Sequence, residues 1–163
     1  WKKFKELSGV LCGKRWSLKL KGRVYRVCVR TVMVYGGETW VMRKEEEGVL
    51  RRAERAMVRM MSGVKLRDRK SSSELMSMAG LCEDIVLVVR RSRLRWYGHV
   101  LRKTENDGIR EVLEVVVPRK VGRGRPRLGW QEEVRKDMER GGLRVGDAKD
   151  RGRWRGGAFE LPS

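Results

Sequence analysis

The segment 44–62 is the feature that most constrains the fold, because its apolar residues recur every three or four positions. Glu45, Glu46 and Glu47 stand in its first turn, where the helix dipole favours anions, and Gly63 follows as a stop signal. The segment therefore predicts an amphipathic helix that buries one side against other helices. The residues expected on that buried side are Val49, Ala53, Ala56, Met57, Met60 and Met61.

Residues 16–35 predict a second helix, although their many valines also suit a strand. Gly36 and Gly37 end it, since glycine adopts the left-handed conformation that closes a helix. We expect its buried arc to contain Leu20, Val24, Val27, Cys28, Thr31 and Tyr35.

Two more helices are expected in the middle of the chain. Ser71 and Glu74 match a capping box, which begins a short helix over 71–79 that Gly80 closes. A longer helix is expected over 84–102, with Gly98 inside it weakening it by about 1 kcal/mol relative to alanine. The apolar line of this longer helix is formed by Ile85, Val88, Val89, Trp96 and Val100.

The C-terminal third gives weaker signals. Residues 111–117 fit either a helix end or a strand, because three valines precede Pro118. Residues 130–140 predict a helix, and the last twenty residues are expected to form a weakly ordered tail around a short turn at 147–153. The apolar side of the helix over 130–140 is formed by Trp130, Val134 and Met138.

These segments predict an all-α fold, a small helical bundle followed by a basic helical extension with a disordered Gly/Arg-rich linker and tail. The expected divisions are a helical bundle at 1–66, a helical extension at 67–118, a basic Gly/Arg/Pro linker at 119–129, and a C-terminal helix with its tail at 130–163.

The charge of the chain points to a polyanionic partner. Its 40 Lys and Arg outnumber its 21 Asp and Glu, which gives a net charge of +19. Arginine supplies 27 of the cations, and its planar guanidinium pairs with two phosphate oxygens at once. This balance favours RNA or DNA held mainly through phosphates.

Arginines form stripes along three of the expected helices. A charged helix face is more often solvated than ligand-binding, but these stripes contain few carboxylates at i,i+4 spacing. Packed together, the three helices could present one basic wall to a phosphate backbone. The expected binding residues on the three helices are Arg23, Arg26 and Arg30, then Arg51, Arg55 and Arg59, then Arg91, Arg95 and Arg102.

The sharpest short motif is the Gly-Arg-Gly-Arg-Pro-Arg run at 122–127, which is similar to an AT-hook. Such a segment would place Arg123, Arg125 and Arg127 in the narrow minor groove of A·T-rich DNA. A flexible basic linker is the alternative interpretation of this run. The helices at 71–79 and 84–102 also fit a helix-turn-helix, so a sequence-specific DNA-binding regulator is an alternative function.

The sequence contains no recognisable catalytic or metal-binding apparatus. Its aspartates are scattered singly, and Cys12, Cys28 and Cys82 stand too far apart for a zinc site. His99 alone could serve as a base, and we expect it instead to be half-buried and hydrogen-bonded. We therefore expect no cofactor, no metal, no membrane span and no enzymatic activity of this chain.

Several short motifs occur in an order that resembles one family. The succession covers roughly residues 16–155 and resembles the region C-terminal to the polymerase core in reverse transcriptases of LINE-type (non-LTR) retrotransposons. The matching blocks are VYGGETW at 34–40, RAERAM at 52–57, DRK at 68–70, RWYGHVLR at 95–102, GRGRP at 122–126, and then Trp130, Asp150-Arg151 and Trp154-Arg155.

The resemblance implies a thumb, a helical bundle that grips the template–primer duplex, followed by a C-terminal extension. Residues 1–66 would be thumb-like, and the block at 95–102 would lie in the extension. The family's palm signature, its endonuclease domain and the Cys/His knuckle of some relatives are absent from this sequence. The chain thus resembles a fragment that binds nucleic acid without polymerising or cleaving it, the polymerase domain lying upstream and outside this sequence.

Two further alternatives stay open on sequence alone. One is an orphan nuclease or polymerase piece. The other is an interaction module whose basic helix at 44–62 binds an acidic partner. The unpaired cysteines and the lack of a secretion signal are typical of an intracellular chain.

Overall fold

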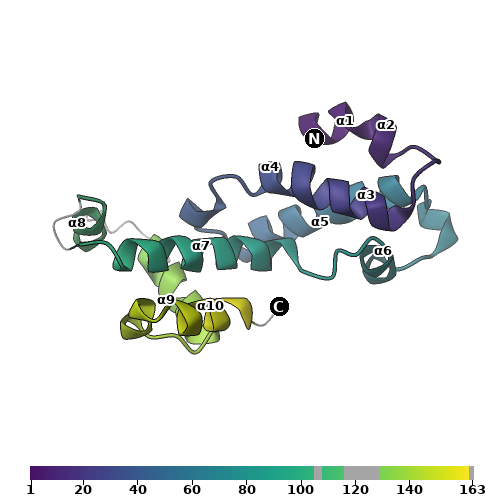
Figure 1. The fold of residues 1–163 in the computed structure, drawn as a ribbon. Coiled ribbons are helices and arrows are strands. Elements are labelled where there is room, and N and C mark those ends of the chain that lie inside the picture. The colour runs from purple at the N-terminus through teal and green to yellow at the C-terminus, as the bar shows by residue number, and fades with distance from the viewer. Residues whose placement is uncertain (105–107, 116–128, 162–163) are drawn as a thin grey trace, which may run out of the picture. The chain divides into compact units, whose positions relative to one another are not determined.

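The computed structural model describes residues 1–104, 108–115 and 129–161 (Figure 1). These residues are helical or irregular and contain no strand, which confirms the all-α prediction. The chain divides into two compact units, one formed by Trp1–Tyr35 and Met42–Val88 and the other by Gly36–Val41 and Val89–Ser163. The predicted linker at 119–129 lies outside the described residues except for Gly129.

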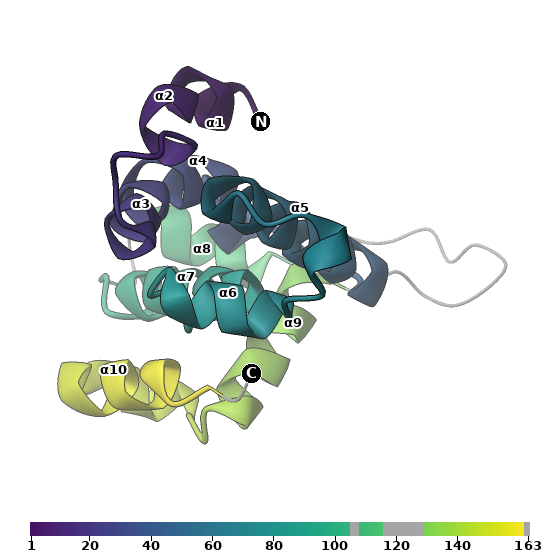
Figure 2. The same ribbon diagram turned by 90° about the vertical axis from the view of Figure 1, so that its right-hand side faces the viewer.

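The first unit is a small helical bundle. Within it α5 packs against both α3 and α6 (Figure 2). Its elements are α1 (Lys2–Glu6), α2 (Ser8–Leu11), α3 (Leu18–Val24), the π-helical η1 (Tyr25–Arg30), α4 (Thr31–Met33), α5 (Lys44–Ser62), the 3-10 helix η3 (Leu66–Asp68), α6 (Ser72–Met78) and the start of α7 (Ile85–Leu101).

The helix predicted over 16–35 is present, but its buried side matches the expected one only at Val24, which packs against the core, and at the half-buried Cys28. Ser17 caps α3 by accepting a hydrogen bond from the Leu20 backbone N–H. Leu20, Val27, Thr31 and Tyr35 of the predicted arc are all exposed. The side that faces the bundle is formed instead by Lys21, Gly22, Tyr25, Val29 and Arg30.

A close backbone approach explains this orientation. A Cβ built on Gly22 would lie 1.8 Å from the Ala79 carbonyl oxygen, so a glycine is required where α3 meets the end of α6. Apolar residues occur all round this helix, so their spacing alone does not fix which side is buried. The contact at Gly22 and an ion pair of Arg30, described below, determine it.

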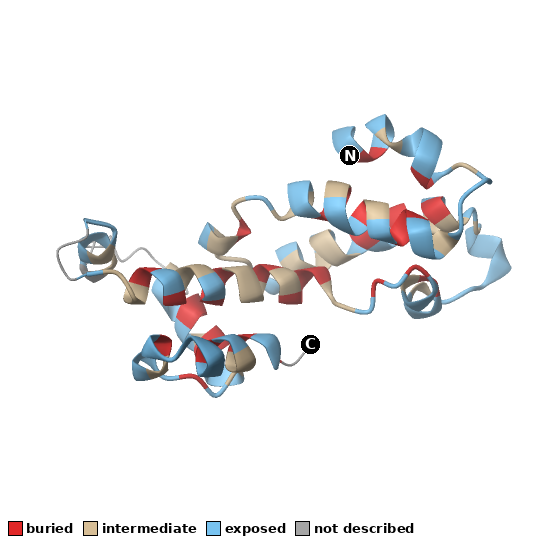
Figure 3. Cartoon of the chain, in the orientation of Figure 1, coloured by how far each residue is buried: buried red, intermediate tan, exposed pale blue. Residues whose placement is uncertain are grey.

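The helix α5 has the predicted bounds, and Gly63 closes it with a φ of 67°. Half of its predicted stripe is wrong. Met57 and Met61 are buried, whereas Val49, Ala56 and Met60 are exposed. The helix is rotated so that Glu54 and Val58 face inward in their place. The core of this unit (Figure 3) contains Phe4, Leu11, Tyr25, Val29, Met57, Val58, Met61, Leu75, Ala79 and Leu81.

The second unit contains the remainder of α7 and the C-terminal helices. The ambiguous segment at 111–117 is helical up to Glu114, and α9 has the bounds predicted for it. The elements that follow α7 in the described residues are α8 (Gly108–Glu114), α9 (Trp130–Arg140), the 3-10 helix η4 (Val145–Lys149) and α10 (Arg151–Phe159), and the 3-10 turn η2 (Gly37–Thr39) also belongs to this unit.

The prediction of a weakly ordered tail after residue 143 was wrong. Asp150 caps α10 by accepting hydrogen bonds from the backbone N–H groups of Gly152 and Arg153. Trp154 is buried, and its indole N–H donates to the Leu94 carbonyl of α7 at 2.9 Å. One tryptophan and one cap therefore order a segment whose glycine content suggested a tail.

A buried ion pair holds the second unit together. Arg93 of α7 is completely buried, and its Nη1 lies 2.5 Å from an Asp137 carboxylate oxygen of α9. Its Nη2 donates to the Trp40 carbonyl at 2.8 Å. Burial raises the pKa of Asp137, while Arg93, Arg90 and Arg140 act to lower it. Arg93 thus joins α7, α9 and the 36–41 segment.

Candidate nucleic-acid interface

The first predicted arginine stripe divides into two exposed residues and one buried residue. Arg23 of α3 and Arg26 of η1 are exposed, and neither has an ion pair among the described residues. Arg30 is only 3% exposed. Its guanidinium is therefore not available to a phosphate, and the expectation that it lies on a binding face was wrong.

Arg30 belongs to a buried polar network of the first unit. Its Nε lies 2.7 Å from a Glu54 carboxylate oxygen, and its Nη2 donates to the Glu83 carbonyl at 2.6 Å. The Tyr25 hydroxyl donates to the same Glu54 oxygen at 3.4 Å. Burial, and next the negative charge of Glu54, raise the pKa of Tyr25 well above its usual range. Arg30 thus links η1, α5 and the segment before α7.

The second stripe, on α5, also divides by role. Arg51 Nε lies 2.6 Å from an Asp84 carboxylate oxygen, and its Nη1 lies 3.5 Å from Glu47. Arg59 is half-buried and donates to the Lys70 carbonyl at 3.0 Å. Arg55 is exposed, and no carboxylate of the described residues pairs with it. Arg52 is equally exposed and unpaired on the same helix.

The carboxylates of the first unit are largely engaged in internal contacts. This unit contains 20 Lys and Arg against nine Asp and Glu. Because the cations of this unit outnumber its carboxylates by more than two to one, many of its arginines have no carboxylate of the unit to neutralise them. The engaged carboxylates are Glu54 with Arg30, Asp84 and Glu47 with Arg51, Glu6 with Lys3, Glu46 with the Arg43 N–H, and Asp68 with the Lys65 N–H.

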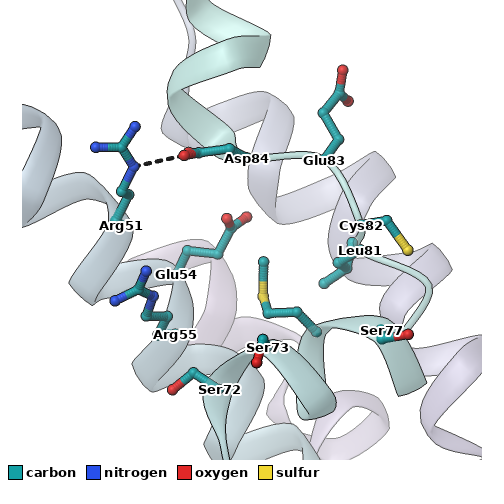
Figure 4. Close-up of a pocket in the computed structure, with 11 residues that line it drawn as sticks. Arg51, Glu54, Arg55, Ser72, Ser73, Ser77, Leu81, Cys82, Glu83 and Asp84 are labelled. Carbon is teal, nitrogen blue, oxygen red and sulfur yellow. Dashed lines mark hydrogen bonds and ion pairs between the residues drawn. The ribbon is translucent and has the colours of Figure 1, made fainter. Parts of the chain in front are cut away.

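A cleft of about 660 Å³ lies between α5, α6 and the segment before α7 (Figure 4). Arg51 and Arg55 line it together with three acidic residues, Glu54, Glu83 and Asp84. The Arg51–Asp84 ion pair closes one side, and Glu54 points into the cavity from α5 (Figure 4). Because the charges that line this cleft are mixed, the cleft as a whole does not favour binding of a polyanion. Arg55 also lines it and has no ion pair with any residue that the structure describes.

A second cleft, of about 340 Å³, is strictly basic. The charged residues that line it are Lys19, Arg23 and Arg26, and no carboxylate does. Ala79 and Gly80, where α6 ends, form the opposite wall. The close approach at Gly22 sets the width of this cleft, because it fixes α3 against Ala79. We call this the α3 cleft.

The third predicted stripe has mainly structural contacts. The Arg91 guanidinium donates to the Phe159 carbonyl and lies 4.2 Å from the centroid of the Phe159 ring. Arg102 donates to the Ala148 carbonyl at 3.1 Å, and its pKa is lowered by burial and then by the nearby Arg151. Arg95 is exposed and contacts the Ser92 hydroxyl. The stripe thus ties α7 to the C-terminal segments more than it forms a free surface.

The alternative helix-turn-helix does not fit α6 and α7. A recognition helix reads base edges with residues near its N-terminus. Ile85, Val86 and Leu87 form the first turn of α7, and all three are buried. The AT-hook-like run, with Arg123, Arg125 and Arg127, lies outside the described residues.

The structure also bears on the remaining chemical candidates. His99 is exposed, so the prediction of a half-buried histidine was wrong. Across residues 1–104, 108–115 and 129–161, no group of His, Cys, Asp or Glu side chains is arranged to hold a metal ion. No helix in these ranges is long and apolar enough to cross a bilayer.

Sequence reasoning missed the buried arginines, although a signal for them exists. Glu54 lies three, four and seven positions before Met57, Val58 and Met61, so it falls within a buried stripe. Asp137 occupies the same kind of position beside Val134 and Met138. A carboxylate within an apolar stripe requires a buried cation, which Arg30 and Arg93 supply. Comparison of the chain with protein-family models, with curated proteins and with solved structures gives no match.

Proposed function

We propose that this chain holds RNA or DNA through phosphate contacts of its first unit and contributes no catalytic centre. The observation that carries the proposal is the separation of arginines by role. Arg30 and Arg51 are engaged by carboxylates, while Arg23, Arg26, Arg52 and Arg55 are exposed and have no ion pair within the part of the chain that the structure describes. Unpaired exposed guanidinium groups are the contacts that release counterions from a nucleic acid.

The order of the motifs in the sequence supports a proposal about the kind of protein from which this nucleic-acid-binding chain comes. We infer that the chain is the C-terminal, thumb and post-thumb region of a LINE-type reverse transcriptase. In this proposal the chain grips the template–primer or the target nucleic acid. Polymerisation would belong to an upstream domain of the same polyprotein, which lies outside this sequence.

A salt titration tests the proposal. The full chain is mixed with a labelled DNA duplex, and the affinity is measured by fluorescence anisotropy between about 50 and 200 mM salt. We expect the affinity to fall steeply with salt, because several phosphates are neutralised. The double variant Arg23→Ala/Arg26→Ala should flatten the slope of log affinity against log salt by about 0.9 for each phosphate that it no longer neutralises.

A matched control separates local contacts from net charge. Arg135 and Arg153 are exposed but paired with Glu139 and Asp147, at 2.7 and 2.9 Å. The double variant Arg135→Ala/Arg153→Ala removes the same formal charge and should leave the slope unchanged. An equal flattening by both double variants, or a binding curve that salt does not alter, would contradict the proposal.

A further inference from the structure

One side of the continuous helical segment formed by α3, η1 and α4 is apolar and exposed to solvent. Leu20, Val27 and Tyr35 lie on it, and their side chains are 37, 62 and 85% exposed. Their spacing, with that of Thr31, brings them onto one side of a helix, which is why the sequence predicts that they are buried. The first unit folds without covering them in the part of the chain that the structure describes. We call these four residues the α3 apolar face.

Cations lie along one edge of the α3 apolar face. Leu20 belongs to this face and also lines the α3 cleft, together with Lys19, Arg23 and Arg26. None of the three cations has an ion pair with a residue that the structure describes. The sequence contains no Asp or Glu over 7–37, so the segment brings no carboxylate of its own. A partner that carries carboxylates therefore complements the charge at this edge.

The charges decide which kind of partner covers the face. A second copy of this chain would bring the same cations, and a net charge of +19 on each chain opposes such pairing. Phosphates of a nucleic acid pair with the cations but leave the apolar side chains in water. An amphipathic helix with acidic edges satisfies both features, because its apolar side covers the apolar residues while its carboxylates reach the cations.

We propose that the α3 apolar face binds an amphipathic helix of another protein, whose apolar stripe is bordered by Asp and Glu. The stripe packs along Leu20, Val27 and Tyr35, and the carboxylates enter the α3 cleft beside Arg23 and Arg26. This inference goes beyond the proposed function, because it assigns a protein partner to a surface that phosphates do not cover. An acidic helix and a nucleic acid would compete for the same two arginines.

The test uses the full chain and three labelled designed peptides. The first forms an amphipathic helix with leucines on one side and glutamates along both edges of that side. The second has lysines in place of the glutamates, and the third has the composition of the first in an order that gives no apolar side. In fluorescence anisotropy, the first peptide should bind at least about tenfold more tightly than either of the others.

Val27 and Tyr35 allow the apolar contact to be tested apart from charge, because neither residue lines the α3 cleft. Val27→Ser/Tyr35→Ser should bind the first peptide at least about tenfold more weakly, since apolar contact area is lost. Its affinity for a DNA duplex should stay within about twofold of that of the unmodified chain, because phosphates do not contact these side chains. The control is Val49→Ser/Met60→Ser, which removes two exposed apolar side chains from α5 of the same unit and should leave binding of the first peptide within about twofold.

Three results would show that the inference is wrong. The first is equal binding of the first and third peptides, and the second is peptide binding that Val27→Ser/Tyr35→Ser does not weaken. The third is sedimentation of the unmodified chain as a dimer that this double variant dissociates, because a second copy would then cover the face. Each of these results leaves the proposed function standing. Failure of the unmodified chain to bind a duplex would instead contradict the proposed function and leave this docking surface in place.

Discussion

The indole ring of Trp154 occupies the space that a side chain at position 98 would need. A Cβ built on Gly98 would lie 2.2 Å from Trp154 Nε1 and 2.6 Å from its Cε2. The indole N–H donates to the Leu94 carbonyl one turn earlier on α7. Gly98 is therefore required for packing against Trp154, although a glycine inside a helix usually weakens the helix.

Gly98→Ala should destabilise the chain. Helix propensity favours alanine by about 1 kcal/mol, but the rigid ring of Trp154 cannot move aside without breaking its hydrogen bond. Overpacking of this kind costs about 1–3 kcal/mol, so we expect a net decrease in the free energy of unfolding. Urea denaturation followed by circular dichroism measures the change.

The control for this variant is Gly156→Ala in α10. A Cβ at Gly156 has no atom within 4 Å, so only helix propensity acts there. We expect an increase of up to about 1 kcal/mol in the free energy of unfolding. If both glycine variants stabilise the chain, Gly98 does not carry the packing role assigned to it.

Arg93→Ala should lower the free energy of unfolding far more than Arg95→Ala does. The change leaves the fully buried Asp137 without its closest cation and frees the Trp40 carbonyl. Breaking such a pair costs about 3–5 kcal/mol, so we expect the second unit to unfold at lower urea concentration. Arg95→Ala, on the same helix but exposed, should change the free energy of unfolding by less than about 0.5 kcal/mol. Equal effects of the two substitutions would contradict the structural role of Arg93.

Where each helix begins and ends in this chain is set by nearby residues. Which side of the helix is buried depends on residues far away in the sequence. Glycines and caps end α5 and α9 at the predicted residues, because these signals act within one turn. The buried side of α3 depends on Gly22 meeting Ala79, a contact between residues 57 positions apart. Spacing of apolar residues could not predict it, since Leu20 and Val27 fit a buried arc as well as Tyr25 and Val29 do.

The candidate site is subject to the same limit. The sequence predicts Arg23, Arg26 and Arg30 on one face of a helix. Because all three are arginines, it gives no reason to expect one to be buried and the other two exposed. Separation comes from Glu54 on another helix, which pairs with Arg30 and leaves the other two exposed. Whether an arginine is structural or free is thus a tertiary property, which the spacing along one helix does not contain.

The division of arginines by role predicts opposite phenotypes. Arg30→Ala should lower the free energy of unfolding by about 3–5 kcal/mol, because Glu54 is left buried without its cation. The folded fraction should nevertheless keep the salt slope of the unmodified chain. Arg26→Ala should leave stability within about 0.5 kcal/mol and flatten the slope by about 0.9 on a DNA duplex. Urea titration and anisotropy on the same preparations give both readouts, and a flattened slope for folded Arg30→Ala would contradict the assignment.

The buried Tyr25 makes stability depend on alkaline pH. Its pKa is raised by burial and by Glu54, so folding holds the phenolic proton more tightly than the unfolded chain does. The difference between the folded and the unfolded pKa of Tyr25 contributes to the free energy of unfolding. This contribution is fully present below the unfolded pKa of about 10 and is lost as the pH rises above it. We expect the free energy of unfolding, measured in urea between about pH 8 and pH 11, to fall at the alkaline end.

Tyr25→Phe should lower the free energy of unfolding by about 1 kcal/mol at neutral pH, because the hydroxyl hydrogen bonds are removed, and should make its alkaline fall shallower. Tyr35→Phe is the control, because that ring is 85% exposed and water solvates its hydroxyl in the folded chain. An alkaline fall of the same steepness in Tyr25→Phe and Tyr35→Phe would show that Tyr25 does not carry this dependence.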